Sequence, residues 1–348
     1  MAALVTERVF SGSMEDLPAQ VSNVVQVFIS STFTDFQEER NWIMKHAVPR
    51  LRKFCQERGL DFQIADMRWG VREDAIDDHR TTEMCLHTIH ECQRISRGPN
   101  FVAFLGDKYG FRPFPSEIEE EEFKLLKNAA LKLGQDPALL LTWFKCDYNM
   151  EPTMYCLQPI SSQYSHYFDM SPANSILRQQ VISRKPTMNF LQPISSQYSH
   201  YFDMTPANSI LRQQAQKDWW NTVEKLTGLL RNTADSLHFE GKLSFAQRHK
   251  YFMSVTESEV QEGLLSGVEV KHKAVCFIRR LDGIEPTHYI SGRFTDLKDG
   301  GVDLEAQELR ERLCMELVPS VIPPSQLYRY TVPWDGNKGV STANEDQN

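Results

Sequence analysis

Polar side chains that can bind a nucleotide follow three short apolar stretches of the sequence. They are Ser30 and Ser31 at the end of 24–30, Asp66, Arg68 and Trp69 at the end of 61–67, and Asp107 and Tyr109 after 101–105. An arginine such as Arg68 can hold a phosphate through two hydrogen bonds, and Trp69 or Tyr109 can stack on a base. Asp66 can accept a hydrogen bond from a ribose. The alternative is that Asp66 and Arg68 form a structural ion pair and that Trp69 belongs to the core.

The first of these groups depends on the stretch VVQVFISSTFTDFQEER, residues 24–40. Its β-branched start predicts a buried strand over 24–30, and a helix is expected from about 35 to 58 with a kink at Pro49. Thr34 or Asp35 is expected to cap that helix. Ligands of open α/β sheets bind outside the carboxyl ends of the strands, beside helix N-termini. The other interpretation is a plain connection whose hydroxyls only cap.

Two more strand patterns, at 61–67 and 101–105, are separated by a helical pattern that starts at Thr81. Strands that alternate with helices predict βαβ units, an α/β fold and a mainly parallel sheet. The strand ends, and the polar groups after them, are then expected to share one edge of the sheet.

The rest of the chain predicts a helical insertion within this sheet. We expect 1–22 to be a flexible lead-in, 23–134 the first part of the α/β core, 135–270 the insertion, 271–334 the strands and helix that complete the core, and 335–348 a tail. The expected elements are an acidic helix from Glu117, a strand near 154–157, helices over 213–233 and 244–265, a strand at 274–278, a helix from Asp303 to Leu317 and a last strand at 326–332.

A tandem duplication lies inside the expected insertion. Residues 152–180 and 186–214 differ only at Tyr155/Asn189, Cys156/Phe190 and Ser171/Thr205, with an offset of 34 residues. Two copies with internal prolines do not make a solenoid. One copy is therefore expected to be surplus to the fold, as a true tandem exon or an error in the gene model.

Composition narrows the class of protein. The net charge of −8 argues against a nucleic-acid-binding protein. Seven cysteines without metal-type spacing indicate free thiols in a reducing, cytoplasmic setting. No apolar run approaches the roughly 18 residues of a membrane span.

Sequence motifs of the common catalytic and metal sites are missing. There is no Walker A sequence, dinucleotide fingerprint, GxSxG or HExxH. His87 and His90, with Glu83 and Glu91 beside them, can in principle bind a metal, but helix-face histidines are more often plain surface or core residues. We therefore expect no metal site and no bound cofactor.

A series of motifs carries a family resemblance over residues 24–335. The motifs are VFISSTFTDFQEER, ADMRWGV, MCLHTIHEC, FVAFLGDKYGFRP, LQPIS, KDWW and RHKYFMSVTESEVQEGLL. With them the chain resembles the TIR-like domain of unknown function at the N-terminus of the NACHT and WD repeat domain-containing proteins. In that family an NTPase domain and WD40 repeats follow, and this chain stops before either. The family has one LQPIS segment where this chain has two.

The resemblance implies a flavodoxin-like sheet with helices on both faces and a role in signalling, through protein partners or self-association. The alternative that it implies is an NAD(P) glycohydrolase, with NAD as substrate, because some TIR domains cleave NAD with a glutamate on the helix after the third strand. By position this glutamate is Glu122, and Glu120 is next. Such a carboxylate stabilises positive charge on the ribosyl carbon. Residues 111–115 depart from the enzymatic TIR pattern, which favours the interaction role.

Overall fold

The computed structural model describes residues 22–68, 76–164, 167, 206–266, 273–337 and 339–340. Trp69, nearly all of the expected lead-in, most of both duplicated copies and the end of the expected tail lie outside these residues.

A six-stranded sheet forms the centre of the molecule, with the order β11-β10-β7-β3-β1-β2. The strands are β1 (Val24–Ser30), β2 (Asp61–Ala65), β3 (Phe101–Leu105), β7 (Ala274–Asp282), β10 (Leu327–Asp335) and β11 (Gly339–Val340). All neighbours are parallel except β11, which runs antiparallel to β10. The five parallel strands thus follow the 2-1-3-4-5 order of flavodoxin-like sheets. The predicted α/β class and mainly parallel sheet are confirmed.

Alternation along the strands gives the sheet two buried faces. Phe28 stacks on Phe101 at 6.0 Å on one face, while Ile29 and Phe104 pack with Phe36 on the other. Both faces therefore need helices to exclude water.

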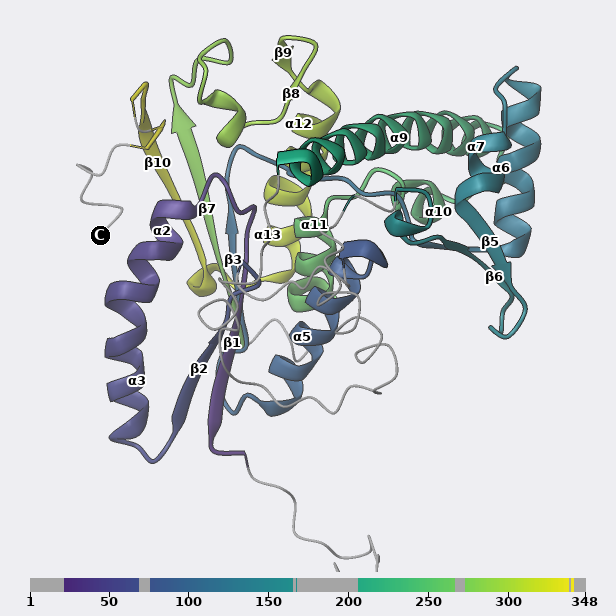
Figure 1. Cartoon of the computed structure of the whole chain (residues 1–348). Coiled ribbons are helices and arrows are strands. Elements are labelled where there is room, and N and C mark those ends of the chain that lie inside the picture. Colours follow the sequence, from purple (N-terminus) through teal and green to yellow (C-terminus); the bar gives the residue numbers. More distant parts are fainter. Residues whose placement is uncertain are drawn as a thin grey trace, which may run out of the picture.

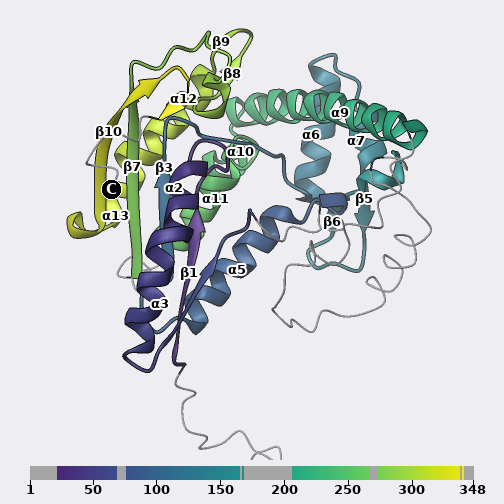
Figure 2. The same cartoon turned by 60° about the vertical axis from the view of Figure 1, so that its left-hand side comes forward.

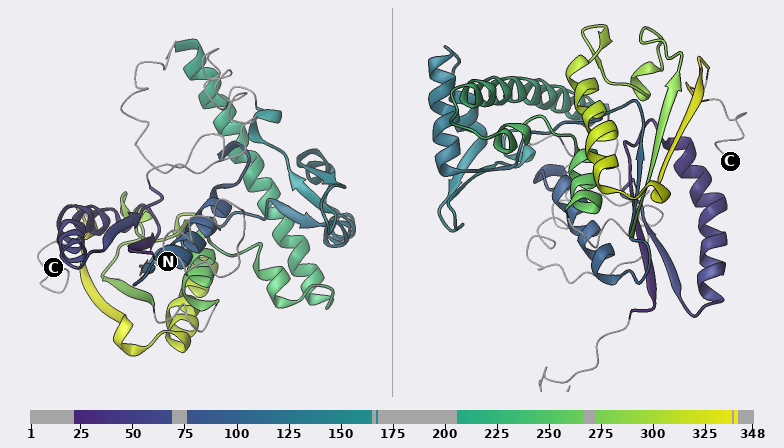
Figure 3. Two further views of the ribbon diagram at one scale, coloured as in Figure 1. Left: turned by 90° about the horizontal axis from the view of Figure 1, so that it is seen from below. Right: turned by 180° about the vertical axis from the view of Figure 1, so that it is seen from behind.

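The helices are divided unequally between the two faces. In Figure 1, α2 and α3 lie on one side of the sheet and α5, α11 and α13 on the other, and the view from behind in Figure 3 agrees. We call the first side face A and the second face B. Face A carries α2 (Gln37–Trp42), the π-helical turn η1 (Ile43–Ala47) and α3 (Val48–Gln56). Face B carries α5 (Thr81–Ile95), α11 (Val255–Val260), η4 (Gln261–Leu265), α12 (Leu304–Glu311), η7 (Arg312–Leu317) and α13 (Val318–Val321).

A second core lies away from the sheet, in the arm shown in Figure 2. Its buried residues extend from Ile118 to Phe252 and include Trp143, Leu226 and Tyr251. The elements are β4 (Glu117–Glu119), α6 (Glu120–Lys132), α7 (Ala138–Trp143), β5 (Phe144–Asp147), β6 (Met154–Leu157), η2 (Ile160–Ser162), α9 (Pro206–Phe239) and α10 (Phe245–His249), with strand order β4-β6-β5. The short elements η6 (Ser291–Arg293), β8 (Leu297–Lys298), β9 (Gly301–Val302) and η8 (Pro324–Gln326) complete the described chain.

Three local predictions were wrong. Asp35 does not cap α2, whose N-cap is Phe36 without a side-chain hydrogen bond. The predicted helix 244–265 is broken, because Ser254 takes an extended conformation and its hydroxyl accepts from the backbone N–H of Glu257, starting a new helix. The acidic run begins as strand β4 and becomes helical only at Glu120.

Candidate functional site

The carboxyl ends of β1 and β2 are joined by a buried arginine. Arg40 of α2 is fully buried, and its guanidinium donates to the Ser31 hydroxyl at 2.8 Å, to the Ile29 carbonyl at 3.1 Å and to Asp66 at 2.7 Å. Arg68 binds the second carboxylate oxygen of Asp66 at 2.8 Å. Burial raises the pKa of Asp66, but the hydrogen bond from Arg68 and the charge of Arg40 outweigh it and leave this pKa below its usual range.

A second arginine lies at the topological switch point, which is the place between β1 and β3 where the strand order of the sheet reverses. Arg279 of β7 is fully buried, lies 4.1 Å from the ring centre of Phe36, donates to the Asp35 carbonyl at 3.0 Å and pairs with Glu39. The Asp35 carboxylate lies so close to Gly106 that a Cβ there would overlap Asp35 Oδ2. Burial raises the pKa of Asp35 to about 7.

Helix α11 brings two more carboxylates to this end of the sheet. The Ser30 hydroxyl donates to Glu259 Oε2 at 2.6 Å, and burial raises the pKa of Glu259 to about 7. The Tyr109 hydroxyl donates to Glu257, which also binds His249 Nε2 at 2.8 Å. Tyr109 is buried, so its ring does not offer a free face for a base.

The predicted strand-end residues that the structure describes therefore share one edge of the sheet, and each of them is bound by neighbours in the protein. Asp107 is also bound by neighbours. Its carboxylate accepts a hydrogen bond from the backbone N–H of Leu281 at 2.6 Å and lies 3.4 Å from the guanidinium of Arg310. We call this group the strand-end cluster, and the residues that the structure adds to it are Asp35, Glu39, Arg40, Gly106, Glu257, Glu259 and Arg279. For Arg68, the alternative interpretation as an ion pair with Asp66 is the one observed. Trp69 lies outside the described residues.

The two predicted glutamates belong to a different part of the molecule. Glu122 is buried in α6 beside the second core, where it accepts from the Tyr251 hydroxyl and from Lys250 Nζ at 2.7 Å. Glu120 pairs with Lys124 at 3.1 Å. The structure does not bring either carboxylate to the strand-end cluster.

Comparison with known proteins finds one family of domains that part of the chain is similar to. Residues 26–131 match the family model described as "Domain of unknown function (DUF4062)". The matched residues include β1, β2 and β3 but not β7 and β10, so the DUF4062 match covers only part of the sheet.

Relatives extend the similarity over most of the chain. "NACHT and WD repeat domain-containing protein 2" of Mus musculus and of Homo sapiens are each 29% identical to it, over 333 and 334 residues. "NACHT domain- and WD repeat-containing protein 1" of Mus musculus is 39% identical over 140 residues, 40% of this chain and 9% of that protein. The chain spans 17% of the length of the first two relatives, which match 92% of it. No solved structure matches the chain.

The described part of the chain adds no metal centre to the strand-end cluster. Among the described residues, no three His, Cys, Asp or Glu side chains are grouped as metal ligands would be, and His90 instead binds Glu262 at 2.6 Å. The seven cysteines are free thiols, as predicted. None of the described helices has the length and apolar character to cross a bilayer.

Proposed function

We propose that this chain is a regulatory protein-interaction domain of a NACHT- and WD-repeat-type protein, with a TIR-like signalling role. The similarity to NACHT and WD repeat proteins over 92% of the chain supports the setting. One structural observation favours interaction over catalysis: Asp35 and Arg279 fill the switch point at Gly106, where flavodoxin-like sheets bind ligands.

The test is association. Purified 1–348 is measured by light scattering over a concentration series, and the tagged protein is recovered from cells to identify bound proteins. Self-association or a reproducible partner is expected. A strict monomer that recovers no partner would overturn the proposal.

The second candidate is an NAD(P) glycohydrolase, and Glu259 is the observation in its favour. In the strand order of the sheet, α11 is the face B helix that leads from β3 to β7. Glu259 of α11 binds Ser30 at the end of β1 and has a pKa raised by burial to about 7. Perturbed carboxylates of this kind are enriched at active sites. The earlier candidates Glu122 and Glu120 stay proposals for the same role.

A single assay separates these candidates. The protein is incubated with NAD, and free nicotinamide is measured by chromatography for the wild type, Glu259→Gln and Glu122→Gln. If only one of the two variants stops releasing nicotinamide, the carboxylate replaced in that variant is the catalytic one. Absence of product from concentrated, folded wild-type protein removes the glycohydrolase.

A further inference from the structure

Strand β10 lies at an outer edge of the sheet. Its neighbours in the strand order are β7 on one side and the two-residue strand β11 on the other. Because β11 pairs only with Trp334 and Asp335, no strand among the described residues pairs with the outer side of 327–333. Figure 2 and the right-hand view of Figure 3 place β10 at the margin of the sheet. The backbone N–H and C=O groups along such an edge can pair with a strand of another chain.

Open space borders this edge on both faces of the sheet. A cavity of about 1780 Å³ is lined by every residue of β10 from Leu327 to Thr331. Since successive side chains of a strand point to opposite faces, the cavity extends over face A and face B of β10. Sites for small molecules have volumes of roughly 300–1,000 Å³. The larger volume and its position on both faces therefore fit an extended peptide that lies beside β10.

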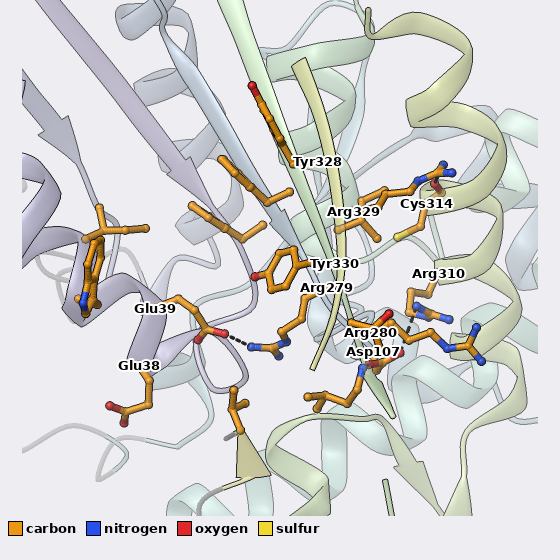
Figure 4. Close-up of a pocket in the computed structure, with 18 of the residues that line it drawn as sticks. Glu38, Glu39, Asp107, Arg279, Arg280, Arg310, Cys314, Tyr328, Arg329 and Tyr330 are labelled. Carbon is orange, nitrogen blue, oxygen red and sulfur yellow. Dashed lines mark hydrogen bonds and ion pairs between the residues drawn. The ribbon is translucent and has the colours of Figure 1, made fainter. Parts of the chain in front are cut away.

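The part of this cavity on face A is aromatic. Phe277 and Tyr328 stack with 5.1 Å between their ring centres, and Tyr328 is 51% exposed. Tyr330 lies on the same side of β10, toward Glu38 and Glu39 (Figure 4). We call this region the aromatic groove, which is lined by Trp42, Phe277, Tyr328 and Tyr330. The rings favour apolar side chains of a ligand, and the two glutamates disfavour acidic ones on this face.

The part of the cavity on face B is basic. Arg329 is exposed and points to this side of β10 (Figure 4). Arg280 of β7 is also exposed and lines the same cavity. Neither arginine forms an ion pair with another described residue, whereas Arg310 pairs with Asp107 and Glu311 at 3.4 and 3.6 Å. Two positive charges are therefore available to acidic side chains of a ligand.

We propose that β10 binds an extended segment of a partner protein as an added strand, in which apolar side chains alternate with acidic ones. The apolar side chains enter the aromatic groove, and the acidic ones pair with Arg280 and Arg329. Backbone hydrogen bonds along 327–333 provide affinity, and the alternation provides specificity. This free edge spans roughly 23 Å, which matches a peptide of about seven residues. The inference rests on the proposed function, because it assigns the partner's surface and chemistry.

Fluorescence anisotropy of labelled heptapeptides with the whole chain 1–348 tests the added strand. The acidic probe is SIEIEIS, and the lysine probe is SIKIKIS. The acidic probe is expected to bind at least tenfold more tightly than the lysine probe. Arg329→Glu is expected to weaken the acidic probe at least tenfold and to strengthen the lysine probe, a gain that a misfolded variant cannot produce. Arg94→Glu, at an exposed position on α5, is the matched control and should change neither affinity.

Methylation of the peptide backbone separates strand pairing from simple charge attraction. A strand bonds to its neighbour through the N–H groups of alternate residues, so only one of two methylation patterns interferes with pairing. In one pattern the amide nitrogens of both glutamates are methylated, and in the other those of the first two isoleucines. One pattern is expected to weaken the acidic probe at least tenfold, and the other to leave its affinity within about twofold.

Several outcomes would overturn the added strand. These are no binding of the acidic probe, equal affinity for the acidic and lysine probes, and equal effects of the two methylation patterns. A labelled peptide of residues 341–348 that binds as tightly as the acidic probe would identify the chain's own end as the occupant. A dimer that Arg329→Glu dissociates in light scattering would identify a second copy.

The recovery experiment distinguishes failure of this site from failure of the proposed function. A partner from cells that wild type and Arg329→Glu recover equally would support the proposed function and overturn the added strand at β10. Binding of the synthetic probes does not depend on any cellular partner, so it succeeds or fails independently of that recovery.

Discussion

The strand-end cluster and the aromatic groove, an open region of face A that Trp42, Phe277, Tyr328 and Tyr330 line, meet at Arg279. From that residue outward they differ in what covers their side chains. In the cluster, Arg40, Asp35 and Glu259 are withdrawn from water and held by specific partners. In the groove, Tyr328 and Trp42 are apolar in character and about half exposed. A buried charge is strongly destabilising when its partner is removed, so the cluster contributes to the stability of the fold. Uncovered aromatic rings gain by binding, so the groove is the surface to test for function.

The largest expected effect comes from removing a buried partner. Arg40→Met leaves Asp66 and the Ser31 hydroxyl without their arginine donor, and should lower the free energy of unfolding by about 3–5 kcal/mol. Urea unfolding followed by circular dichroism measures it. The matched control is Arg94→Met, because the pair of Arg94 with Glu91 lies at the surface and its loss should leave the free energy of unfolding nearly unchanged. Equal losses in both variants would show that the cluster is open to solvent.

A pH effect of Glu259 should come next in size. Its folded pKa of about 7 lies above the ordinary value of 4.5, so the folded protein holds an extra proton between these pH values. Stability is therefore lost as the pH rises from about 4.5 to 7, and Asp35 acts in the same direction. Glu259→Gln keeps its side chain neutral.

The difference in unfolding free energy between Glu259→Gln and the wild type should shift in favour of the variant by about 2–3 kcal/mol between pH 5 and pH 8. Urea unfolding at both pH values measures this shift. A constant difference across this range would mean that Glu259 is ionised throughout.

A pair of glycine substitutions tests how tightly the cluster is closed. Gly106→Ala places a methyl group against Asp35 and Phe36, and should cost about 1–3 kcal/mol. Gly228→Ala, in the middle of α9, meets no atom within 4 Å and should stabilise by up to about 1 kcal/mol because alanine favours a helix. Thermal unfolding of both variants measures the contrast. An unchanged stability of Gly106→Ala would show that Asp35 can move away and that the cluster is not tightly packed at Gly106.

Sequence reasoning located the strands and their shared edge because those depend on local patterns. Val25, Val27 and Ile29 define β1 by alternation, and a strand that alternates with helices is parallel to its neighbours. The cluster depends instead on contacts between distant residues. Asp35 looks like a helix cap from its neighbours, but Arg279 binds it from 244 positions away.

The position of the candidate glutamate shows the same limit. Sequence order selects Glu122, because α6 is the first acidic helix after β3. The arm lies between β3 and α11, so the helix that returns to the sheet carries Glu259 instead. The order of the elements along the sequence does not indicate that the arm is inserted between β3 and its crossover helix. The Thr-Glu-Ser-Glu run at 256–259, after the capping Ser254, is the one local signal that could have identified α11.

The smallest expected effect belongs to the groove. Tyr328→Ala removes a half-exposed ring that stacks on Phe277. It should lower the free energy of unfolding by about 1 kcal/mol or less. Phe101→Ala, fully buried against Phe28, is the reference and should cost about 3–5 kcal/mol. Urea unfolding compares the two. Equal costs would mean that the groove is already closed in solution.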